Sequence, residues 1–465
     1  MLKSQKICEK MREMKEGNRA DMFVDETSST VNFIDLFAGA GGLSEGFIQA
    51  GFNPIAHIEM NAMAAATLET RAAYHYMKKH KPLMRWYYEY ERGNITREKL
   101  FEYIPDEVTK TVINAEMTPE NISDIFRHID GIMQEDNVKK VNIIVGGPPC
   151  QAYSLVGRAQ SSHMLVPMSE DPRNELYKMY TRFLKKYQPD MFVFENVAGL
   201  KTARNGESFK NLQAQLRRVG YVIECHEQNA VDFGVLQNRR RMIIIGWRKG
   251  TNYHYPVFEK IQSNALVNDL LSDLPVLERG GQEFTYRVPC AQASRYVKDN
   301  QLRTRSDVLT HHVARNNIPR DVEIYRRTIE EWNNGHQRLK YADLPDELKT
   351  HRNQTAFADR FKVVEGDCTS CHTVLAHLSK DGHYFIHPDI NQCRSISVRE
   401  AARLQTFPDS YYFEGNRTSQ YVQIGNAVPP IMARRIAEAI RKMIETHKAK
   451  ASVTKDIRSQ NSIIA

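Results

Sequence analysis

The sequence predicts an α/β protein built on a doubly wound, mostly parallel sheet that carries a smaller irregular domain. An apolar run at Val31–Phe37 leads into a glycine cluster and a helix-like segment, the opening of a parallel strand–helix–strand unit. A second buried run, Val141–Val145, ends in Gly-Gly-Pro-Pro-Cys. After Arg248 the alternation of strand and helix stops, and regular helical patterns return only at Val398. These three observations predict one large sheet domain interrupted by a loop-rich one.

Length and composition are those of a soluble globular protein. The chain has 465 residues, of which 41% are hydrophobic and 26% charged, enough for roughly two to four compact units. No apolar run approaches the ~18 residues of a membrane span, and residues 1–30 lack the apolar core of a signal peptide. We therefore expect a cytoplasmic protein with no membrane partner. The seven scattered cysteines exclude a disulfide framework.

The net charge of +8 permits nucleic-acid binding without requiring it. Much of the excess lies in residues 394–465, and a second basic stretch runs from Arg295 to Arg320. Either stretch alone is typical of a solvated surface, so charge by itself assigns no partner.

Six candidate strands follow one another before Arg248. Each is a short apolar run bounded by turn or polar residues. They lie at 31–37, 54–58, 141–145, 191–194, 221–224 and 242–247. Helical patterns at 43–50 and 175–187 separate strands, while 61–140 is mostly helical and polar. Nearer the C-terminus the helical patterns are at 398–404 and 431–447.

These patterns divide the chain into five parts. Residues 1–30 form a charged extension, 31–248 the first part of the sheet domain, and 249–392 a loop-rich domain. Residues 393–450 return to complete the sheet domain, and 451–465 form a tail.

The glycine cluster Asp35–Gly42, called the glycine loop below, is suited to hold a nucleoside. It turns a strand into a helix, and its glycines let the backbone approach a ligand closely. Ser44 stands where the dinucleotide fingerprint requires glycine, so the loop does not match a pyrophosphate site. Glu59 ends the next strand, where a carboxylate can accept both ribose hydroxyls. A nucleoside cofactor without a diphosphate fits, and S-adenosylmethionine is the obvious candidate.

A cysteine follows the second buried strand in an unusual setting. Pro148 and Pro149 cannot continue a sheet or supply N–H donors, so they hold the chain rigid and turned. Cys150 is then presented at the carboxyl edge of the sheet, where α/β proteins bind their ligands. The rigid Gly-Gly-Pro-Pro turn before Cys150 therefore favours a thiolate nucleophile over a buried structural cysteine.

Eight motifs in a fixed order give the chain a specific resemblance. They are DLFAGAGGLSEGF, Glu59, GGPPCQAYS, DPRNELY, FENV, DFGVLQNRRR, RSISVREAARLQTFPD and QIGNAVPP. In this order the sequence resembles the DNA cytosine-5 methyltransferases of the bacterial restriction-modification type, from Val31 to about Lys450. The resemblance implies a seven-stranded methyltransferase sheet, with helix 431–447 packed back beside the first strand, and target recognition by 249–392.

The resemblance also implies a covalent mechanism. The thiolate of Cys150 would add to C6 of a cytosine turned out of double-stranded DNA, and C5 would then take the methyl group of S-adenosylmethionine. Glu195 ends a buried strand, where apolar surroundings would favour a protonated carboxyl that can donate to N3 of the base. Arg241 would contact O2 of the base. Arg239, on the same face of its strand, would contact a backbone phosphate.

The same resemblance assigns the cofactor site to residues from several motifs: Asp35, Phe37, Gly39, Gly41, Glu59, Pro148, Leu176 and Asn426. Leu176 would pack on the adenine, and Asn426 would close the pocket from the C-terminal side. The family usually places an Asp, in a Gly-Asp-Ile pattern, to accept from the adenine amino group. Here Asn94 and Asn121 stand in similar patterns, and we favour Asn121 because it lies nearer to the cysteine strand. With that choice, the resemblance implies that residues 70–118 are an insertion.

Double-stranded DNA is the implied macromolecular partner, and a cognate restriction endonuclease is a functional one. The expected DNA contacts are Ser154, Gln237, Arg239, Arg303 and Arg305. Base-reading residues are expected around 359–383, and the long loop 151–170 is expected to close over DNA. We expect the protein to act as a monomer.

Three other interpretations stay open. An RNA cytosine-5 methyltransferase could use the same scaffold, although the Cys-Phe-Thr signature of the transfer-RNA branch is absent. A non-catalytic DNA-binding regulator would be expected to lose Cys150 or Glu195, and both are present. A zinc module could form on Cys368 and Cys371, but no second ligand pair stands at matching spacing, so no metal site is predicted.

Overall fold

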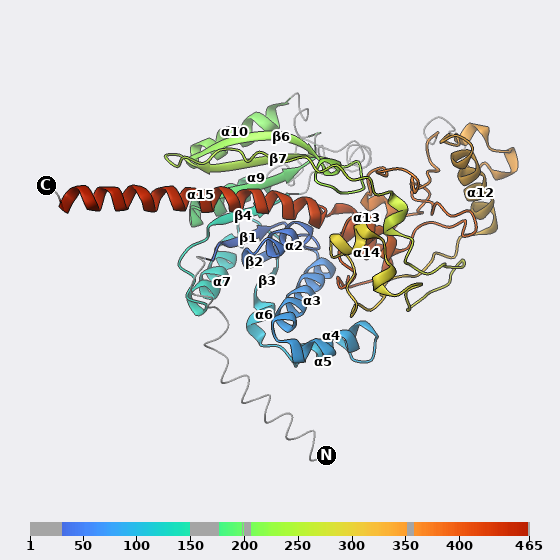
Figure 1. The fold of residues 1–465 in the computed structure, drawn as a ribbon, viewed down its shortest axis with the longest axis horizontal. Helices are drawn as coiled ribbons and strands as arrows, with labels where there is room; N and C mark the ends of the chain where they lie inside the picture. Colours follow the sequence, from blue (N-terminus) through green and yellow to red (C-terminus); the bar gives the residue numbers. More distant parts are fainter. Residues whose placement is uncertain (1–29, 149–175, 198, 200–205, 351–357, 464–465) are drawn as a thin grey trace, which may run out of the picture.

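A central β-sheet organises the structure (Figure 1). The structure is a computed structural model, and it describes residues 30–148, 176–197, 199, 206–350 and 358–463. Within these residues seven strands form one sheet in the order β3-β2-β1-β4-β5-β7-β6. Their bounds are Asn32–Leu36 (β1), Asn53–Glu59 (β2), Val112–Asn114 (β3), Ile143–Gly146 (β4), Met191–Asn196 (β5), Tyr221–Asn229 (β6) and Arg240–Arg248 (β7).

The sheet is mostly parallel, as predicted. Strands β1 to β5 pair in parallel, whereas β7 runs antiparallel to both β5 and β6. All six predicted strands belong to it. The strand that the sequence did not indicate is β3, because three residues are too few to show an apolar period. β3 lies inside residues 70–118, so that segment is not wholly an insertion.

Helices cover both faces of the sheet (Figure 1). The α-helices of the described residues are α2 (Gly42–Gln49), α3 (Ala62–Lys79), α4 (Met84–Glu91), α5 (Arg97–Phe101), α6 (Asp106–Lys110), α7 (Ile122–Glu135), α9 (Leu176–Tyr187), α10 (Glu207–Arg218), α11 (Arg295–Asp299), α12 (Pro319–Asn333), α13 (Val398–Leu404), α14 (Arg417–Asn426) and α15 (Pro430–Ile463). Of these, α2 and α15 pack on one face of the sheet, and α7, α9 and α10 pack on the other. In the described residues no helix is both long and apolar enough to cross a membrane.

Alternate strand residues enter two different cores. Phe33 and Val145 pack in the core shared with α2 and α15. Ile34 and Ile144 pack in the core shared with α7, α9 and α10. This alternation is the two-residue period of strands that are buried on both faces. It explains why the strands read in the sequence as continuous apolar runs.

The last helix closes the sheet domain from the C-terminal side. α15 packs along α2 so closely that a Cβ on Gly46 would lie 2.4 Å from Cβ of Ala433. Arg441 also donates a hydrogen bond to the carbonyl of Ala50, at 2.7 Å. The prediction that this helix packs back beside the first strand is confirmed, because its apolar face shares the core of Phe33. The predicted tail is instead helical as far as Ile463, and α15 projects beyond the sheet (Figure 1).

The helices between β2 and β3 form a small aromatic cluster of their own. Tyr74, Tyr87 and Tyr90 are buried in it. Two of these rings reach the C-terminal part of the chain: the hydroxyl of Tyr87 donates to the Ser410 carbonyl at 3.0 Å, and that of Tyr90 donates to Glu414 at 2.7 Å. The insertion is therefore fastened to the segment that follows α13.

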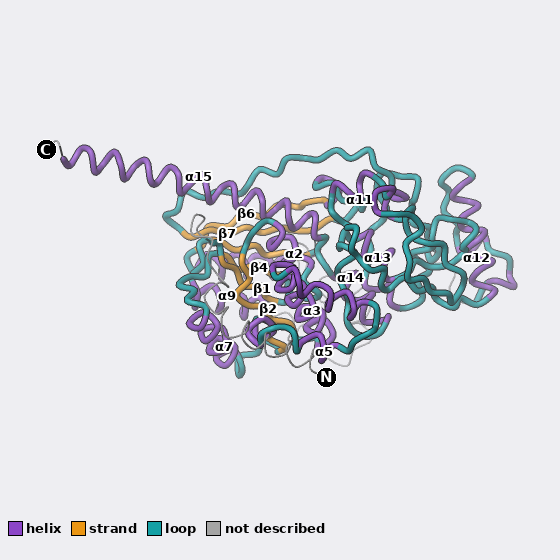
Figure 2. The backbone as a smooth tube through the Cα atoms, turned by 60° about the horizontal axis from the view of Figure 1, so that its bottom comes forward, coloured by secondary structure: helices purple, strands orange, loops and turns teal. Residues whose placement is uncertain are grey.

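The chain between β7 and α13 is mostly loop, as predicted (Figure 2). One part forms a separate core around α12, in which Tyr325 and Phe361 are buried. Another part, including Val267 and Phe385, packs into the core beneath the sheet. Single-turn 3-10 helices mark this region at Val267–Leu270, Cys290–Gln292, Tyr341–Asp343, Asp346–Leu348 and Ala376–Ser379.

A buried network of charges joins the loop-rich region to α13. The guanidinium of Arg403 binds Asp409 through two hydrogen bonds, at 2.5 and 2.6 Å, and Asp273 at 3.1 and 3.2 Å. Arg303 pairs with the same Asp273 at 2.7 Å. Buried charges are stable only when they are paired in this way. The network fixes the loop-rich region against the C-terminal part of the sheet domain.

Candidate active site

The glycine loop makes a tight turn at the carboxyl end of β1. Phe37, Gly39 and Gly41 all have positive φ angles, of 57°, 55° and 79°. Gly41 caps α2, and a Cβ there would lie 2.7 Å from Leu68 and 2.8 Å from the hydroxyl of Tyr411. The loop therefore presents bare backbone next to a helix N-terminus, the arrangement that the sequence predicted.

Glu59 fastens this loop to the end of β2. Its two carboxylate oxygens accept hydrogen bonds from the backbone N–H of Gly39, at 2.8 Å, and of Asn61, at 2.7 Å. Burial raises the pKa of Glu59, and these N–H donors partly offset that rise. The carboxylate thus lies against the glycine loop, where the predicted ribose contact requires it.

Asp35, near the end of β1, is buried. Its side chain is 1% exposed and its carboxylate is 3.9 Å from Nδ1 of His57. Burial raises the pKa of Asp35, although His57 lowers it in part. This burial contradicts the predicted direct cofactor contact of Asp35, because a side chain enclosed by the protein beside His57 presents no surface to a ligand.

The chain after β4 passes between the glycine loop and Glu195. A Cβ on Gly146 would lie 2.3 Å from the carbonyl oxygen of Leu36, and one on Gly147 would lie 2.7 Å from Oε2 of Glu195. Asn196 then holds the turn by donating to the carbonyl of Pro148 at 3.2 Å. Two glycines are needed here because the backbone runs between two close neighbours. The predicted nucleophile Cys150 and the predicted DNA contact Ser154 lie outside the described residues.

Glu195 and Arg241 form an ion pair beside this turn. Nε of Arg241 is 2.8 Å from Oε1 of Glu195, and both side chains are largely buried. Neighbouring strands bring them together, because β5 pairs with β7 and Glu195 lies opposite Ile243. The structure thus joins two residues 46 positions apart that the sequence assigned to one base. The expectation of apolar surroundings for Glu195 is wrong, since its neighbour is a cation.

Arg239 and Gln237 are both fully buried, so the DNA contacts predicted for them are wrong. Arg239 donates to the carbonyl oxygens of Val374 at 2.7 Å, Ala427 at 2.8 Å and Gly425 at 3.1 Å. The shared strand face expected for Arg239 and Arg241 also fails, because β7 begins only at Arg240.

Gln237 is held in a similar way. Its amide donates to the Leu404 carbonyl at 3.0 Å and to Gln405 at 2.9 Å, and it accepts from the N–H of Val374 at 3.0 Å. Both side chains therefore hold the protein together around β7.

The remaining cofactor predictions have different outcomes. Asn426 is exposed at the end of α14, and the next turn of chain reaches the glycine loop, since a Cβ on Gly42 would lie 2.3 Å from the Val428 carbonyl. Leu176 is half-buried at the start of α9. Asn121 instead closes its own loop, accepting from the N–H of Thr118 at 3.0 Å.

One exposed carboxylate at this edge of the sheet was not singled out from the sequence. Glu116 is exposed two residues after β3, at the same sheet edge as Glu59. Finding β3 in the sequence would have indicated it.

The two arginines predicted to contact DNA from the loop-rich region differ in environment. Arg303 is buried, pairs with Asp273, and lies 3.5 Å above the ring of Tyr286. Its predicted phosphate contact is therefore wrong, because the guanidinium is committed to the interior. Arg305 is exposed, and its DNA contact stays a prediction.

The Cys-x-x-Cys segment serves as scaffold. Cys371 is 2% exposed, and burial raises the pKa of its thiol. The next residue, His372, binds Glu365 through Nδ1 at 2.7 Å and the Tyr384 carbonyl through Nε2 at 2.6 Å. Across the described part of the chain no three His, Cys, Asp or Glu side chains are grouped to hold a metal ion.

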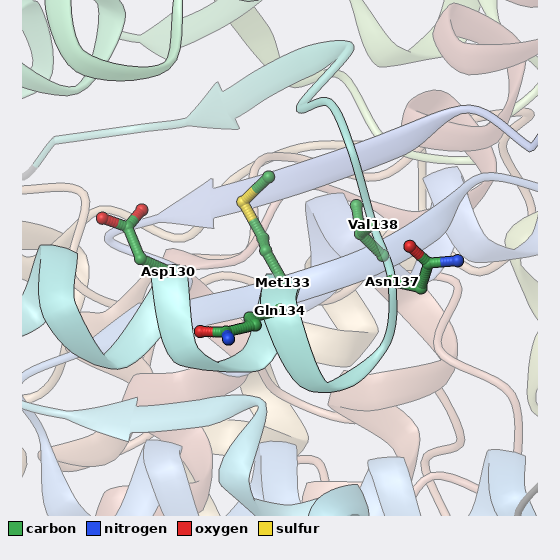
Figure 3. A pocket seen from close by; sticks show the side chains of 5 residues that line it. All are labelled: Asp130, Met133, Gln134, Asn137 and Val138. Atoms are coloured by element: carbon green, nitrogen blue, oxygen red, sulfur yellow. The ribbon is translucent and has the colours of Figure 1, made fainter.

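A shallow hollow of about 360 Å³ lies at the C-terminal end of α7 (Figure 3). Its lining residues are Asp130, Met133, Gln134, Asn137 and Val138. They belong to the end of α7 and the turn that leads toward β4. This is the amino edge of the sheet, whereas α/β proteins bind ligands at the carboxyl edge.

Comparison with known proteins agrees with this geometry. The sequence model of the C-5 cytosine-specific DNA methylases matches residues 31–82 and 110–442. The chain is 41% identical over 447 residues to the type II methyltransferase M.Bpa9945I of Bacillus paralicheniformis, covering 89% of this chain and 99% of that relative. It is 30% identical to M1.HphI of Haemophilus parahaemolyticus, covering 89% and 87% of the two chains.

Solved structures share the fold. A structure described as a DNA modification methyltransferase encoded within an E. coli prophage superposes with a TM-score of 0.59 at 22% identity, covering 90% of this chain and all of the other. The methyltransferase EhMeth of Entamoeba histolytica superposes with a TM-score of 0.50 at 15% identity, covering 90% of this chain and 99% of the other. The family match over most of the sequence, together with the sheet and the Glu195–Arg241 pair, leads to one conclusion: the chain belongs to the C-5 cytosine-specific DNA methylases and resembles the type II enzymes of bacterial restriction-modification systems.

Proposed function

We propose that this protein transfers a methyl group from S-adenosylmethionine to C5 of cytosine within a specific double-stranded DNA sequence, as the modification enzyme of a restriction-modification system. The Glu195–Arg241 pair is the observation that carries the proposal. It lies beside the turn that leads to Cys150, at the sheet edge that also holds the glycine loop. Methyl transfer to cytosine requires groups that activate the base and a loop that binds the nucleoside cofactor, and here both lie at the carboxyl edge of the sheet.

The chain's residues fit S-adenosylmethionine. Nothing lies within 4 Å of the position that a Cβ on Gly39 would take, so the glycine loop leaves room for a ligand there, and the Glu59 carboxylate is suited to accept from both ribose hydroxyls. Glu116, an exposed carboxylate two residues after β3, is a better acceptor for the adenine amino group than Asn121. When bound, the cofactor supplies an electrophilic methyl group.

The protein's own part in the chemistry is to make C5 nucleophilic. The Cys150 thiolate adds to C6, and the electron density of the C5–C6 bond moves toward the N3/O2 side of the ring. Arg241 donates a hydrogen bond to O2, and the carboxyl group of Glu195 delivers a proton to N3, so the negative charge that develops on the ring is neutralised. After methylation at C5, a base removes the C5 proton, and re-formation of the C5–C6 double bond expels the thiolate.

Bisulfite sequencing of DNA from cells that express the chain tests the proposal. The expected result is protected cytosines that share one short sequence, absent from cells that express the Cys150→Ser variant. Resistance of that DNA to an endonuclease cutting the same sequence would support the modification role. Unmodified DNA, or methyl groups found only in transfer RNA, would overturn the proposal.

A further inference from the structure

Residues 371–376, called the bridging segment, run alongside the entrance to β7. The N–H of Cys371 donates to the Leu236 carbonyl at 3.1 Å, and the N–H of Asn238 donates back to the Cys371 carbonyl at 2.8 Å. The hydroxyl of Thr373 adds a hydrogen bond to the Asn238 carbonyl at 2.6 Å. The loop-rich region thus supplies a short strand-like partner to the residues just before Arg241.

The same segment packs against the end of α14. A Cβ on Gly425 would lie 2.2 Å from the backbone nitrogen of Ala376 and 2.4 Å from the carbonyl carbon of Leu375. Backbone therefore packs directly on backbone, with no room for a side chain. Asn426, the residue assigned to the cofactor side, follows at once. The bridging segment therefore contacts both the chain next to Asn426, which would contact the cofactor, and the chain that leads into β7, which carries the base contact Arg241.

Arg239 joins these three pieces of chain. One guanidinium nitrogen donates to the Val374 carbonyl in the bridging segment, and the other donates to the carbonyls of Gly425 and Ala427. The last two flank Asn426. A planar guanidinium has fixed donor directions, so three carbonyls around it are held at fixed positions. The arrangement is fully buried, where hydrogen bonds are strong and costly to lose.

We propose that Arg239 is a positioning residue that couples the cofactor side of the active site to the base side. By holding the carbonyls around Asn426, it sets the place of that side chain. Because it stands two residues before Arg241, it also sets the start of the strand that carries the base contact. The inference rests on the proposed function, which assigns Asn426 to the cofactor and Arg241 to cytosine.

The chain offers a matched control one residue away. Arg240 is exposed and pairs with Glu227 at 3.3 Å on the surface of the β6–β7 pair. Arg239→Met removes the three hydrogen bonds at similar volume, and Arg239→Lys keeps the charge but replaces the planar fork with a single nitrogen. Arg240→Met removes an equal charge without touching Asn426 or the bridging segment.

Calorimetry with S-adenosylhomocysteine and steady-state kinetics on the purified full chain test the coupling. For Arg239→Met we expect the cofactor Kd and KM to rise at least about fivefold and kcat to fall, with Arg239→Lys intermediate. Arg240→Met should keep the wild-type cofactor Kd. A merely structural role would lower Tm but leave the Kd of the folded variant unchanged. A cofactor Kd for Arg239→Met within about twofold of wild type, measured well below its Tm, would overturn the inference.

Hydrogen exchange in the wild-type protein tests the same coupling if the Arg239 variants do not fold. Adding S-adenosylhomocysteine should protect peptides covering 423–428 and 371–376 together, although the bridging segment belongs to the loop-rich region. Protection of 423–428 without any change in 371–376 would contradict the coupling. A wild-type protein that binds no S-adenosylhomocysteine would instead refute the proposed function, and the coupling with it.

Discussion

Replacing Glu59 by glutamine changes one oxygen of the side chain that links the glycine loop to the cofactor. The carboxylate accepts from two backbone N–H groups, of Gly39 at 2.8 Å and Asn61 at 2.7 Å. The amide of Glu59→Gln can accept from only one of them, and its NH2 group must face the other donor. The variant therefore loses a hydrogen bond to a charged acceptor and places two donors together.

The magnitude follows from those contacts. A hydrogen bond to a charged group contributes about 1.5–3 kcal/mol, so the glycine loop should lose about that much local stability. If the ribose hydroxyls donate to the same carboxylate, cofactor affinity should fall roughly ten- to a hundred-fold. Glu59→Ala, which removes every acceptor, should lose at least as much.

Calorimetric titration with S-adenosylmethionine measures this loss, and Glu102→Gln is a suitable control because Glu102 is exposed in the insertion. Burial raises the pKa of Glu59 above its usual value. Wild-type affinity should therefore fall as the pH drops through that raised pKa, while Glu59→Gln should show little of this dependence. A cofactor Kd for Glu59→Gln within twofold of wild type at neutral pH would refute the cofactor-site assignment.

Three further outcomes are expected. Cys150→Ser should abolish methyl transfer, because a neutral hydroxyl adds poorly to C6, yet keep wild-type cofactor binding by calorimetry; substantial activity would refute the covalent route. Arg303→Ala should lower the free energy of unfolding by about 1.5–3 kcal/mol, since Asp273 loses one arginine partner but keeps Arg403. Arg305→Ala should leave stability unchanged and reduce the slope of log binding constant against log salt concentration for DNA by about 1; the reverse pattern would contradict these assignments. Burial lowers the pKa of His387 to about 4. The neutral ring of His387 therefore contributes fully to the free energy of unfolding above about pH 6.5, and this contribution falls by up to ~3 kcal/mol as the pH drops toward 4. Urea unfolding of His387→Gln should show a correspondingly smaller loss of stability over this pH range, and the same loss as in the wild type would contradict the assignment.

The parts of the fold that the sequence predicted are those encoded locally. The glycine loop and Glu59 lie within one strand–turn–helix–strand unit, so their residue order already specifies their contacts. The strands could be predicted because both of their faces are buried, which makes each one a continuous apolar run in the sequence. β3 escaped prediction because three residues carry no detectable period.

The errors concern side chains whose environment comes from distant segments. Arg239 looks like a DNA contact in a run of arginines, but its acceptors are 135 to 188 residues further along the chain. Arg303 lies in a basic stretch, and its partner Asp273 is 30 residues away. A pattern of like charges shows neither where the chain folds back nor which carboxylates and carbonyls it brings. Only the packing of the loop-rich region against α13 and α14 distinguishes these buried arginines from exposed Arg305.

Covalent trapping tests the central claim most directly. Duplex DNA with 5-fluorocytosine at the methylated position is incubated with the full chain and S-adenosylmethionine, and the products are separated under denaturing conditions. Fluorine cannot leave C5 as a proton does, so the Cys150–C6 bond should persist as a protein–DNA complex that requires the cofactor and is absent with Cys150→Ser. Methylation of ordinary cytosine without any such complex, or an equal complex with Cys150→Ser, would contradict the account.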